Sequence, residues 1–285
     1  MTGIKAHTIR IWEKRYGIIE PHRTDTNIRY YSDNDLKKLL NISILNNSGW
    51  KISHIAELSN EEINSEVLKL ASQSQEAESI IETMLHATLE LDSALFNKAI
   101  TNAVIAHGFE NAFHKVFFPF YQKVRIHWLT GVISEAQQHF ADSILRQKVI
   151  VALDGLIIPP SENGKRFFIF LPEGHYNELC MLFFAYLIRK SGHKTIYLGQ
   201  SVTRSALRSI AKVKHPDALI TTFTSPLSSC ETESYIKSLC TDFPFQQIYL
   251  TKLQDPENGL DCPLNVKVIH SVEDFKADLS TRYPL

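Results

Sequence analysis

The strongest constraint on the fold is the alternation of short apolar runs with helical patterns from residue 163 to the end of the chain. Runs rich in β-branched and aromatic residues predict strands at 166–171, 194–198, 217–222, 247–251 and 266–270. Helical patterns separate or follow them at 178–190, 204–213, 230–240 and 272–279. This alternation predicts a doubly wound parallel α/β sheet of Rossmann or flavodoxin type. Because ligands of such sheets bind beyond the carboxyl ends of the strands, the loops to examine are 172–177, 199–203, 224–229 and 252–257.

Two further regions precede the sheet. Residues 75 to about 155 read as almost continuous helix, with apolar residues at steps of three and four and Asp92 as a helix cap, which predicts an up-and-down four-helix bundle. Short helical patterns broken by Gly17 and Pro21 occupy the start of the chain. We therefore expect a multidomain protein with domains at 1–72, 75–157 and 163–285, and a linker at 73–75.

Composition excludes several classes of protein. No apolar run approaches the ~18 residues that a membrane span requires, and no secretory signal follows the N-terminus. The four cysteines form no C-x-x-C pair, as expected of reduced thiols. These features predict a cytoplasmic protein with no membrane partner. The net charge of -1 means that any nucleic-acid surface must be local, and the basic stretch up to Arg29 is the candidate.

The basic stretch combines a short amphipathic helix with a basic loop. The helix is expected over 4–16, with Ile4, Ile9, Trp12 and Tyr16 facing a core. His7, Thr8 and Arg10 remain for the outward face. A basic loop follows at 21–31, and Ser32 is placed to cap the next helix. A short helix with polar tips fits the DNA major groove, and flanking arginines can hold phosphates.

The residues of this stretch resemble the MerR family of winged-helix transcription regulators. The resemblance rests on residues 8–17, 20–21, 23 and 27–32, with the family's spacing from recognition helix to wing. It implies that His7, Thr8 and Arg10 approach base edges and the nearest phosphates. It implies that the DNA backbone is held by Arg15, Arg23, Arg29 and Tyr30, and that Trp12 and Ile28 are core residues. The implied partner is double-stranded DNA with an inverted repeat, bound by a dimer.

One feature departs from the MerR pattern. The family begins with a strand-like start and a first helix ahead of the recognition helix, whereas this chain starts with Met1-Thr2-Gly3, close to the turn. The domain at 1–72 is therefore expected to lack its first helix. Either the chain is truncated or the head is a weakened DNA binder, and we expect the former.

The rest of the chain resembles the MerR subgroup whose effector half is a cobalamin-binding unit, as in light-responsive repressors of carotenoid genes. Trp128, Gln138 and His139 stand at the spacing of the residues that the family places above the corrin. Residues 171–183 match the loop and helix that supply the lower cobalt ligand, and Tyr197–Gly199 and Ser225–Leu227 match later landmarks.

The chemistry of that pocket is not carried over intact. The ligating histidine of the family aligns with Asn177, its helix-packing glycine with Cys180, and a later glycine pair with Thr251–Lys252, while Gln138 replaces a carboxylate. An amide is a poor ligand for a metal that calls for imidazole nitrogen. We therefore expect no bound cofactor in the family's usual mode. Cobalamin stays possible through the fold, with His175 as a substitute ligand or with no lower ligand.

The predicted effector pocket comprises Trp128, Gln138, His139, His175, Asn177 and Ser225. Structural alternatives are core packing for Trp128 and Phe140, a buried hydrogen-bonded imidazole for His139, and a simple turn for Ser225. The motifs G-x-S-x-G, P-loop and H-E-x-x-H are absent from the sequence, so we expect no enzyme.

Three functions remain open from the sequence. The favoured one is a MerR-type regulator that responds to an unknown small molecule or to a partner and whose effector pocket has lost cobalamin chemistry. The second is a cobalamin-dependent light or redox sensor. The third is an interaction module without DNA binding. The family resemblance also implies a homo-oligomer, a dimer or a tetramer.

Overall fold

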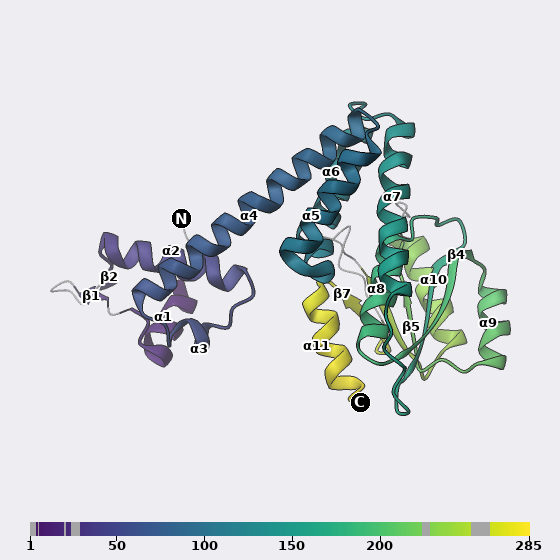
Figure 1. Cartoon of the computed structure of the whole chain (residues 1–285). Helices are drawn as coiled ribbons and strands as arrows, with labels where there is room; N and C mark the ends of the chain where they lie inside the picture. The colour runs from purple at the N-terminus through teal and green to yellow at the C-terminus, as the bar shows by residue number, and fades with distance from the viewer. Residues whose placement is uncertain (1–3, 5, 20, 24–28, 224–228, 252–262) are drawn as a thin grey trace. The chain divides into compact units, whose positions relative to one another are not determined.

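The chain divides into two units, Met1–Glu82 and Thr83–Leu285. The computed structural model describes residues 4, 6–19, 21–23, 29–223, 229–251 and 263–285. The helix α4 (Asn60–Leu89) begins in the first unit and ends in the second (Figure 1). Residues 73–75, where a linker was expected, lie within α4. A polar stretch of sequence suits an exposed helix as well as a loop, so composition could not distinguish the two.

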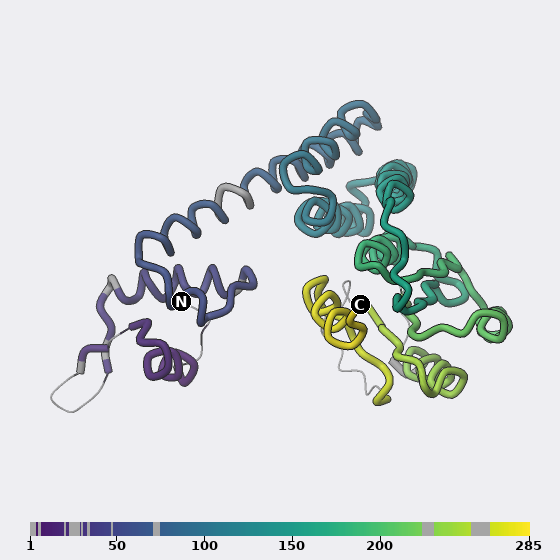
Figure 2. The backbone as a smooth tube through the Cα atoms, turned by 60° about the horizontal axis from the view of Figure 1, so that its bottom comes forward, coloured from purple at the N-terminus to yellow at the C-terminus, as the bar shows by residue number. Residues whose placement is uncertain are grey.

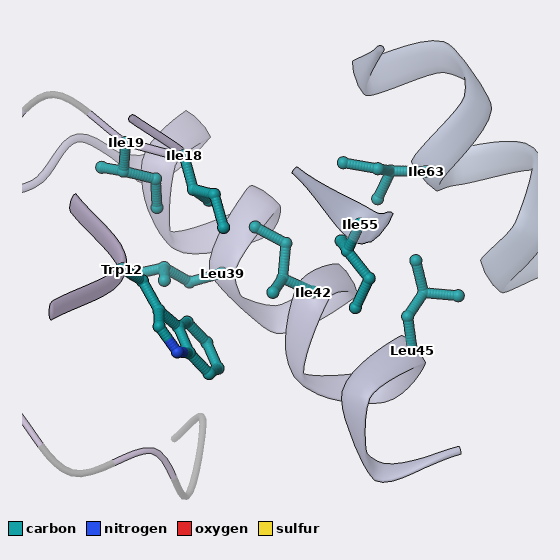
Figure 3. Packing of buried hydrophobic residues seen from close by; sticks show 8 residues of the cluster. All are labelled: Trp12, Ile18, Ile19, Leu39, Ile42, Leu45, Ile55 and Ile63. Atoms are coloured by element: carbon teal, nitrogen blue, oxygen red, sulfur yellow. The ribbon is translucent and has the colours of Figure 1, made fainter. Parts of the chain in front are cut away.

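The first unit consists of helices around a small apolar core and a two-stranded hairpin. Its elements are α1 (Ala6–Tyr16), β1 (His22–Arg23), β2 (Arg29–Tyr30), α2 (Asp33–Asn47), α3 (Ile52–Ile55) and the start of α4. Figure 3 shows the core residues of these helices and of the segment after α1: Trp12, Ile18, Ile19, Leu39, Ile42, Leu45, Ile55 and Ile63. Ile4, Ile9 and Tyr16 pack against this core, as their spacing predicted. Ser32 caps α2 in a capping box with Asp35, also as predicted.

The helical part of the second unit confirms the predicted bundle. It contains the end of α4, α5 (Ser93–Ala112), the π-helical turn η1 (Phe113–Phe117), α6 (Phe118–Leu129) and α7 (Glu135–Asp154). Asp92 caps α5 by accepting a hydrogen bond from the backbone of Leu95 at 2.9 Å. The side chain of Gln137 donates to the carbonyl of Leu89 at 2.8 Å, which joins the start of α7 to the end of α4.

The remaining residues form the predicted doubly wound sheet. Its strands are β3 (Arg166–Pro172), β4 (Lys194–Val202), β5 (Ala218–Thr221), β6 (Gln247–Thr251) and β7 (Val266–Ile269), all parallel, in the order β4-β3-β5-β6-β7. The helices are α8 (Leu179–Lys190), α9 (Arg204–Val213), α10 (Ser229–Asp242) and α11 (Val272–Arg282). The direction of the strand order reverses between β3 and β5, so the ligand edge of this fold lies at the carboxyl ends of these strands.

Helix α8 lies between the sheet and the bundle, with α7 running alongside it (Figures 1 and 2). Every residue of α8 from Leu179 to Ile188 is buried, which explains its unbroken apolar sequence. Phe183 of α8 stacks on Phe113 of η1 with ring centroids 3.8 Å apart. Glu110 of α5 accepts hydrogen bonds from Lys190 of α8 and Lys276 of α11, at 2.7 and 2.5 Å. Aromatic and ionic contacts therefore hold the bundle on the α/β region.

Strand β4 is longer than predicted at its carboxyl end, which lies at the ligand edge of the sheet. Residues 199–202 were expected in a loop, but β4 continues to Val202 through register shifts against β3. Gly199 and Ser201 have φ values of 81° and 51°, as an irregular strand of this kind requires. The Ser201 hydroxyl accepts a bond from the backbone N–H of Gly174, and the Ser201 N–H donates to the carbonyl of His175. The irregular end of β4 therefore holds the loop after β3 in place.

The other two expected loops, at 224–229 and 252–257, lie largely or wholly outside the described residues. Across the described ranges, no helix combines the length and the apolar character needed to cross a membrane.

Candidate functional site

Helix α1 presents a polar face away from the apolar core of the first unit. His7 and Arg10 are exposed and Thr8 is half-buried, whereas Trp12 of the same helix is buried. This separation follows from the 3.6-residue period, which turns the apolar positions inward together. The predicted orientation of this helix is confirmed. The contacts of its polar residues with DNA stay predictions.

The hairpin that follows α1 has the geometry of a wing. His22 pairs with Tyr30 and Arg23 with Arg29 in antiparallel register. Arg29 Nε donates to Glu13 Oε2 of α1 at 3.2 Å, so the wing is tied to the helix by an ion pair. The guanidinium of Arg15 lies over the ring of Tyr16, 5.5 Å from its centroid. Phosphate contacts by the predicted wing residues stay predictions, and Ile28 lies outside the described residues.

The second candidate site is an open pocket of about 380 Å³ between α7 and the loop that joins β3 to α8. We call it the Asp142 pocket. Its lining residues are His139, Asp142, Ser143, Arg146, Tyr176, Asn177, Glu178, Leu179 and Gln200. It lies at the carboxyl end of β3, beside the point where the strand order reverses, which is where doubly wound folds bind ligands.

Glu178 is the central charged group of this pocket. Its side chain is only 5% exposed, and both of its oxygens are engaged. Arg146 Nε lies 2.5 Å from Oε1, and the Tyr197 hydroxyl donates to Oε2 at 2.7 Å. Burial and the hydrogen bond to Glu178 raise the pKa of Tyr197 well above its ordinary value, so Tyr197 is a neutral donor. The carboxylate is thus compensated by one cation and one hydroxyl.

Asn177 contacts the bundle directly. Its amide Nδ2 donates to the hydroxyl of Tyr121 on α6. Burial, with smaller contributions from the charges of Asp142 and Cys180, raises the pKa of Tyr121, so this hydroxyl is neutral too. The amide therefore acts as a hydrogen-bond bridge between the loop after β3 and the bundle.

Asp142 is the unusual group of the pocket. Its Oδ1 is buried and has no hydrogen-bond partner among the described residues. Burial raises the pKa of Asp142 from 3.8 to about 6, against the opposing effect of His139. An unpaired buried acceptor is uncommon in folded proteins because its desolvation is uncompensated, and such groups often mark functional sites.

Of the six predicted pocket residues, the structure brings His139 and Asn177 together in the Asp142 pocket. His175 is 4% exposed, and its ring packs edge-on against Phe223 instead of lining the pocket. Burial lowers the pKa of His175, so it is neutral. Gln138 is half-buried and does not line the pocket either. Ser225 lies outside the described residues.

The structural alternatives for two bundle residues were wrong. The side chain of His139 is 70% exposed and lies 3.9 Å from Glu135, so it is not a buried imidazole. Trp128 is 41% exposed, so it is not a core residue. It lies in the last turn of α6, where its side chain is exposed to solvent. Phe140 packs edge-on against Phe96, in agreement with its core interpretation.

The sequence interpretation did not identify Asp142, Arg146 or Glu178 as pocket residues. The sequence did contain a signal for Asp142 and Arg146. Asp142 and Arg146 follow His139 by three and seven residues, so the three side chains lie on one face of α7. Tyr121 and Tyr197 had no comparable signal, because their role depends on elements that meet only in the folded chain.

The chain is similar to known proteins in both of its units. The model of the MerR HTH family regulatory protein matches residues 1–62. The HTH-type transcriptional repressor CarH of Myxococcus xanthus is 29% identical over 223 residues, which are 76% of this chain and 74% of that protein. The HTH-type transcriptional repressor CarA of the same organism is 23% identical over 250 residues, 86% of this chain and 82% of that protein.

A solved structure supports the fold of the second unit. The monomethylamine corrinoid protein of Methanosarcina barkeri matches with a TM-score of 0.57 at 14% identity, covering 72% of this chain and 99% of that protein. At this identity the match concerns the fold alone. The chain thus carries a MerR helix–turn–helix domain at its N-terminus, is homologous to the CarH and CarA repressors, and shares the fold of a corrinoid protein in its second unit.

Proposed function

We propose that this protein is a DNA-binding transcription regulator of the MerR type whose effector region keeps the cobalamin-binding fold without the histidine that ligates cobalt. The observation that carries the DNA-binding part is the exposed polar face of α1 beside the β1–β2 hairpin, within the residues that match the MerR domain. A short helix followed by a basic hairpin can read a major groove and hold the adjacent phosphates. Homology to two transcriptional repressors supports the same role. We also propose that the protein regulates transcription without catalysing a reaction.

The test of DNA binding is selection of preferred duplexes from a random pool by the full chain, followed by fluorescence anisotropy on the selected duplex. Arg10→Ala should relax the base preference, because a base contact carries sequence information. Arg15→Ala should weaken all duplexes alike and reduce the slope of log affinity against log salt by about 1, because one phosphate contact is lost. Lys69→Ala, at an exposed position of α4, is the matched control. Equal affinity of the wild type for selected and random duplexes would overturn the proposal.

Two observations support loss of the cobalt ligand. At the position where the resemblance places the ligating histidine, Asn177 donates its amide hydrogen to Tyr121 and leaves only a carbonyl oxygen. Oxygen from an amide suits hard cations, whereas cobalt in this fold calls for imidazole nitrogen. The substitute candidate His175 is buried against Phe223, outside the Asp142 pocket. The residues present therefore do not fit a histidine-ligated corrinoid, and no step of the regulation is assigned to one.

The test of this part is a titration with methylcobalamin or adenosylcobalamin followed in the visible spectrum, with calorimetry as a check. The wild type should bind more weakly than micromolar or not at all, whereas Asn177→His with Cys180→Gly should bind more tightly. Tight binding by the wild type, with the spectrum of a histidine-ligated cobalt, would instead establish the alternative function, a cobalamin-dependent light or redox sensor.

Self-association belongs to the same proposal. A regulator that reads an inverted repeat presents two copies of α1 related by two-fold symmetry, because the two half-sites are themselves related in this way. Light scattering of the full chain at tens of micromolar should therefore give a dimer or a tetramer. A monomer that also binds a single half-site with full affinity would contradict this expectation.

A further inference from the structure

We propose that the Asp142 pocket binds a small organic monocation, an amine whose N–H group donates to the carboxylate of Asp142. This goes beyond the loss of cobalt ligation, because it names the class of molecule that the pocket takes. It deepens the proposed function by identifying an effector class, but its test requires no DNA.

The first argument is the unsatisfied acceptor. Asp142 Oδ1 is buried and finds no donor among the described residues. Three of the neighbouring side chains already donate to other acceptors. Asn177 donates to Tyr121, while Arg146 and Tyr197 both donate to Glu178. A buried carboxylate oxygen without a donor is costly, and Asp142 lines the pocket, so a ligand that supplies an N–H group to this carboxylate gains the energy of a charge-assisted hydrogen bond.

The second argument is charge. The lining residues include two carboxylates, Asp142 and Glu178, and one guanidinium, Arg146. Together the two carboxylates and the guanidinium carry a net charge of −1. Because Glu178 is paired with Arg146 at 2.5 Å, the unbalanced negative charge resides on Asp142. A ligand with a single positive charge neutralises the pocket, whereas an anion would add a like charge.

The third argument is size and lining. A pocket of about 380 Å³ is within the range of small-molecule sites, and it is much too small to enclose a corrin. Tyr176 and Leu179 provide aromatic and apolar surface beside the charged groups. An aromatic ring next to an anionic group favours organic cations over a bare metal ion. The chemistry therefore points to an amine on a short apolar or aromatic body.

The test uses benzylamine, protonated at neutral pH, and benzyl alcohol as its neutral counterpart. Calorimetry on the full chain should show saturable binding of benzylamine and at least about tenfold weaker binding of the alcohol. Asp142→Asn keeps the size of the side chain but removes its charge, and should weaken benzylamine binding at least about tenfold. Asp154→Asn, at an exposed position near the end of the same helix, is the matched control and should bind like the wild type.

A second readout reports on the carboxylate itself. The ¹³C resonance of the Asp142 carboxyl group, assigned by its absence in Asp142→Asn, should titrate at lower pH when benzylamine is bound, because the cation stabilises the ionised form. Equal binding by the wild type and Asp142→Asn, equal binding of amine and alcohol, or no saturable amine binding would each overturn the inference. Retained selective DNA binding in that case would leave the proposed function intact. Amine binding by a chain that fails to select DNA would overturn the proposed function alone.

Discussion

Replacement of Asp142 by asparagine should stabilise the protein, and the gain should depend on pH. Burial raises the pKa of Asp142 from 3.8 to about 6 in the folded protein. The folded state therefore holds this proton more tightly than the unfolded state. The stability contributed by the protonated form is fully present below about pH 4 and is lost as the pH rises through about 6.

The magnitude follows from the size of this shift. A difference of roughly 2 pKa units corresponds to about 3 kcal/mol, at about 1.4 kcal/mol per unit. Asparagine carries no charge at any pH, so it avoids this destabilisation. We expect Asp142→Asn and the wild type to be nearly equal in stability at pH 4, and the variant to be more stable by up to about 3 kcal/mol at pH 8.

The assay is urea unfolding followed by circular dichroism between pH 4 and pH 8, for the wild type, Asp142→Asn and the control Asp154→Asn. The control should follow the wild type at every pH, since Asp154 is exposed. If Asp142→Asn is no more stable than the wild type at pH 8, or if its advantage is the same at pH 4 and pH 8, the buried ionised carboxylate is not the cause and the reasoning fails.

Three further changes test the contacts described above. Arg146→Ala leaves the buried carboxylate of Glu178 without its cation and should lower the free energy of unfolding by about 2 kcal/mol. This loss is smaller than for a fully buried ion pair because Arg146 is half exposed, and adding Glu178→Gln should restore much of it in the same urea assay. Phe183→Ala removes a fully buried ring stacked on Phe113 and should cost about 3–5 kcal/mol, seen as a lower melting temperature; an unchanged melting temperature would contradict the packing. Glu13→Gln frees Arg29 from its ion pair and should tighten DNA binding and steepen the salt dependence by about 1, measured by anisotropy; weaker binding would mean that Glu13 positions Arg29 for DNA.

Local sequence signals were sufficient for most of the elements. The predicted bounds of α9 and β6 coincide with the observed ones, 204–213 and 247–251. The caps at Ser32 and Asp92 form as expected, because capping depends on a side chain and a backbone N–H three residues apart. The inward and outward faces of α1 follow from the same short-range periodicity. The order of strands and helices alone was enough to predict a doubly wound sheet, because parallel strands need helical crossovers.

The Asp142 pocket depended on tertiary structure. The sequence placed His139 and Asn177 near one another only through a family resemblance. It contained no sign that Oδ1 of Asp142 would be buried without a partner among the described residues. Burial of a helical residue depends on which face of the helix meets another element, and the periodicity of α7 does not identify that element. The hydrogen bonds from Asn177 to Tyr121 and from Tyr197 to Glu178 join residues 56 and 19 positions apart, so no local pattern encodes them.

The sequence by itself determined the kinds of elements, their order and the MerR-like head, because propensity, capping and hydrophobic period act over a few residues. The tertiary structure decided that α4 continues through residues 73–75, that β4 extends past Gly199, that Trp128 and His139 are exposed, and that Asp142 Oδ1 has no donor among the described residues. Each of these depends on solvent exclusion and pairing between segments far apart in the chain, and these are properties of the packed molecule.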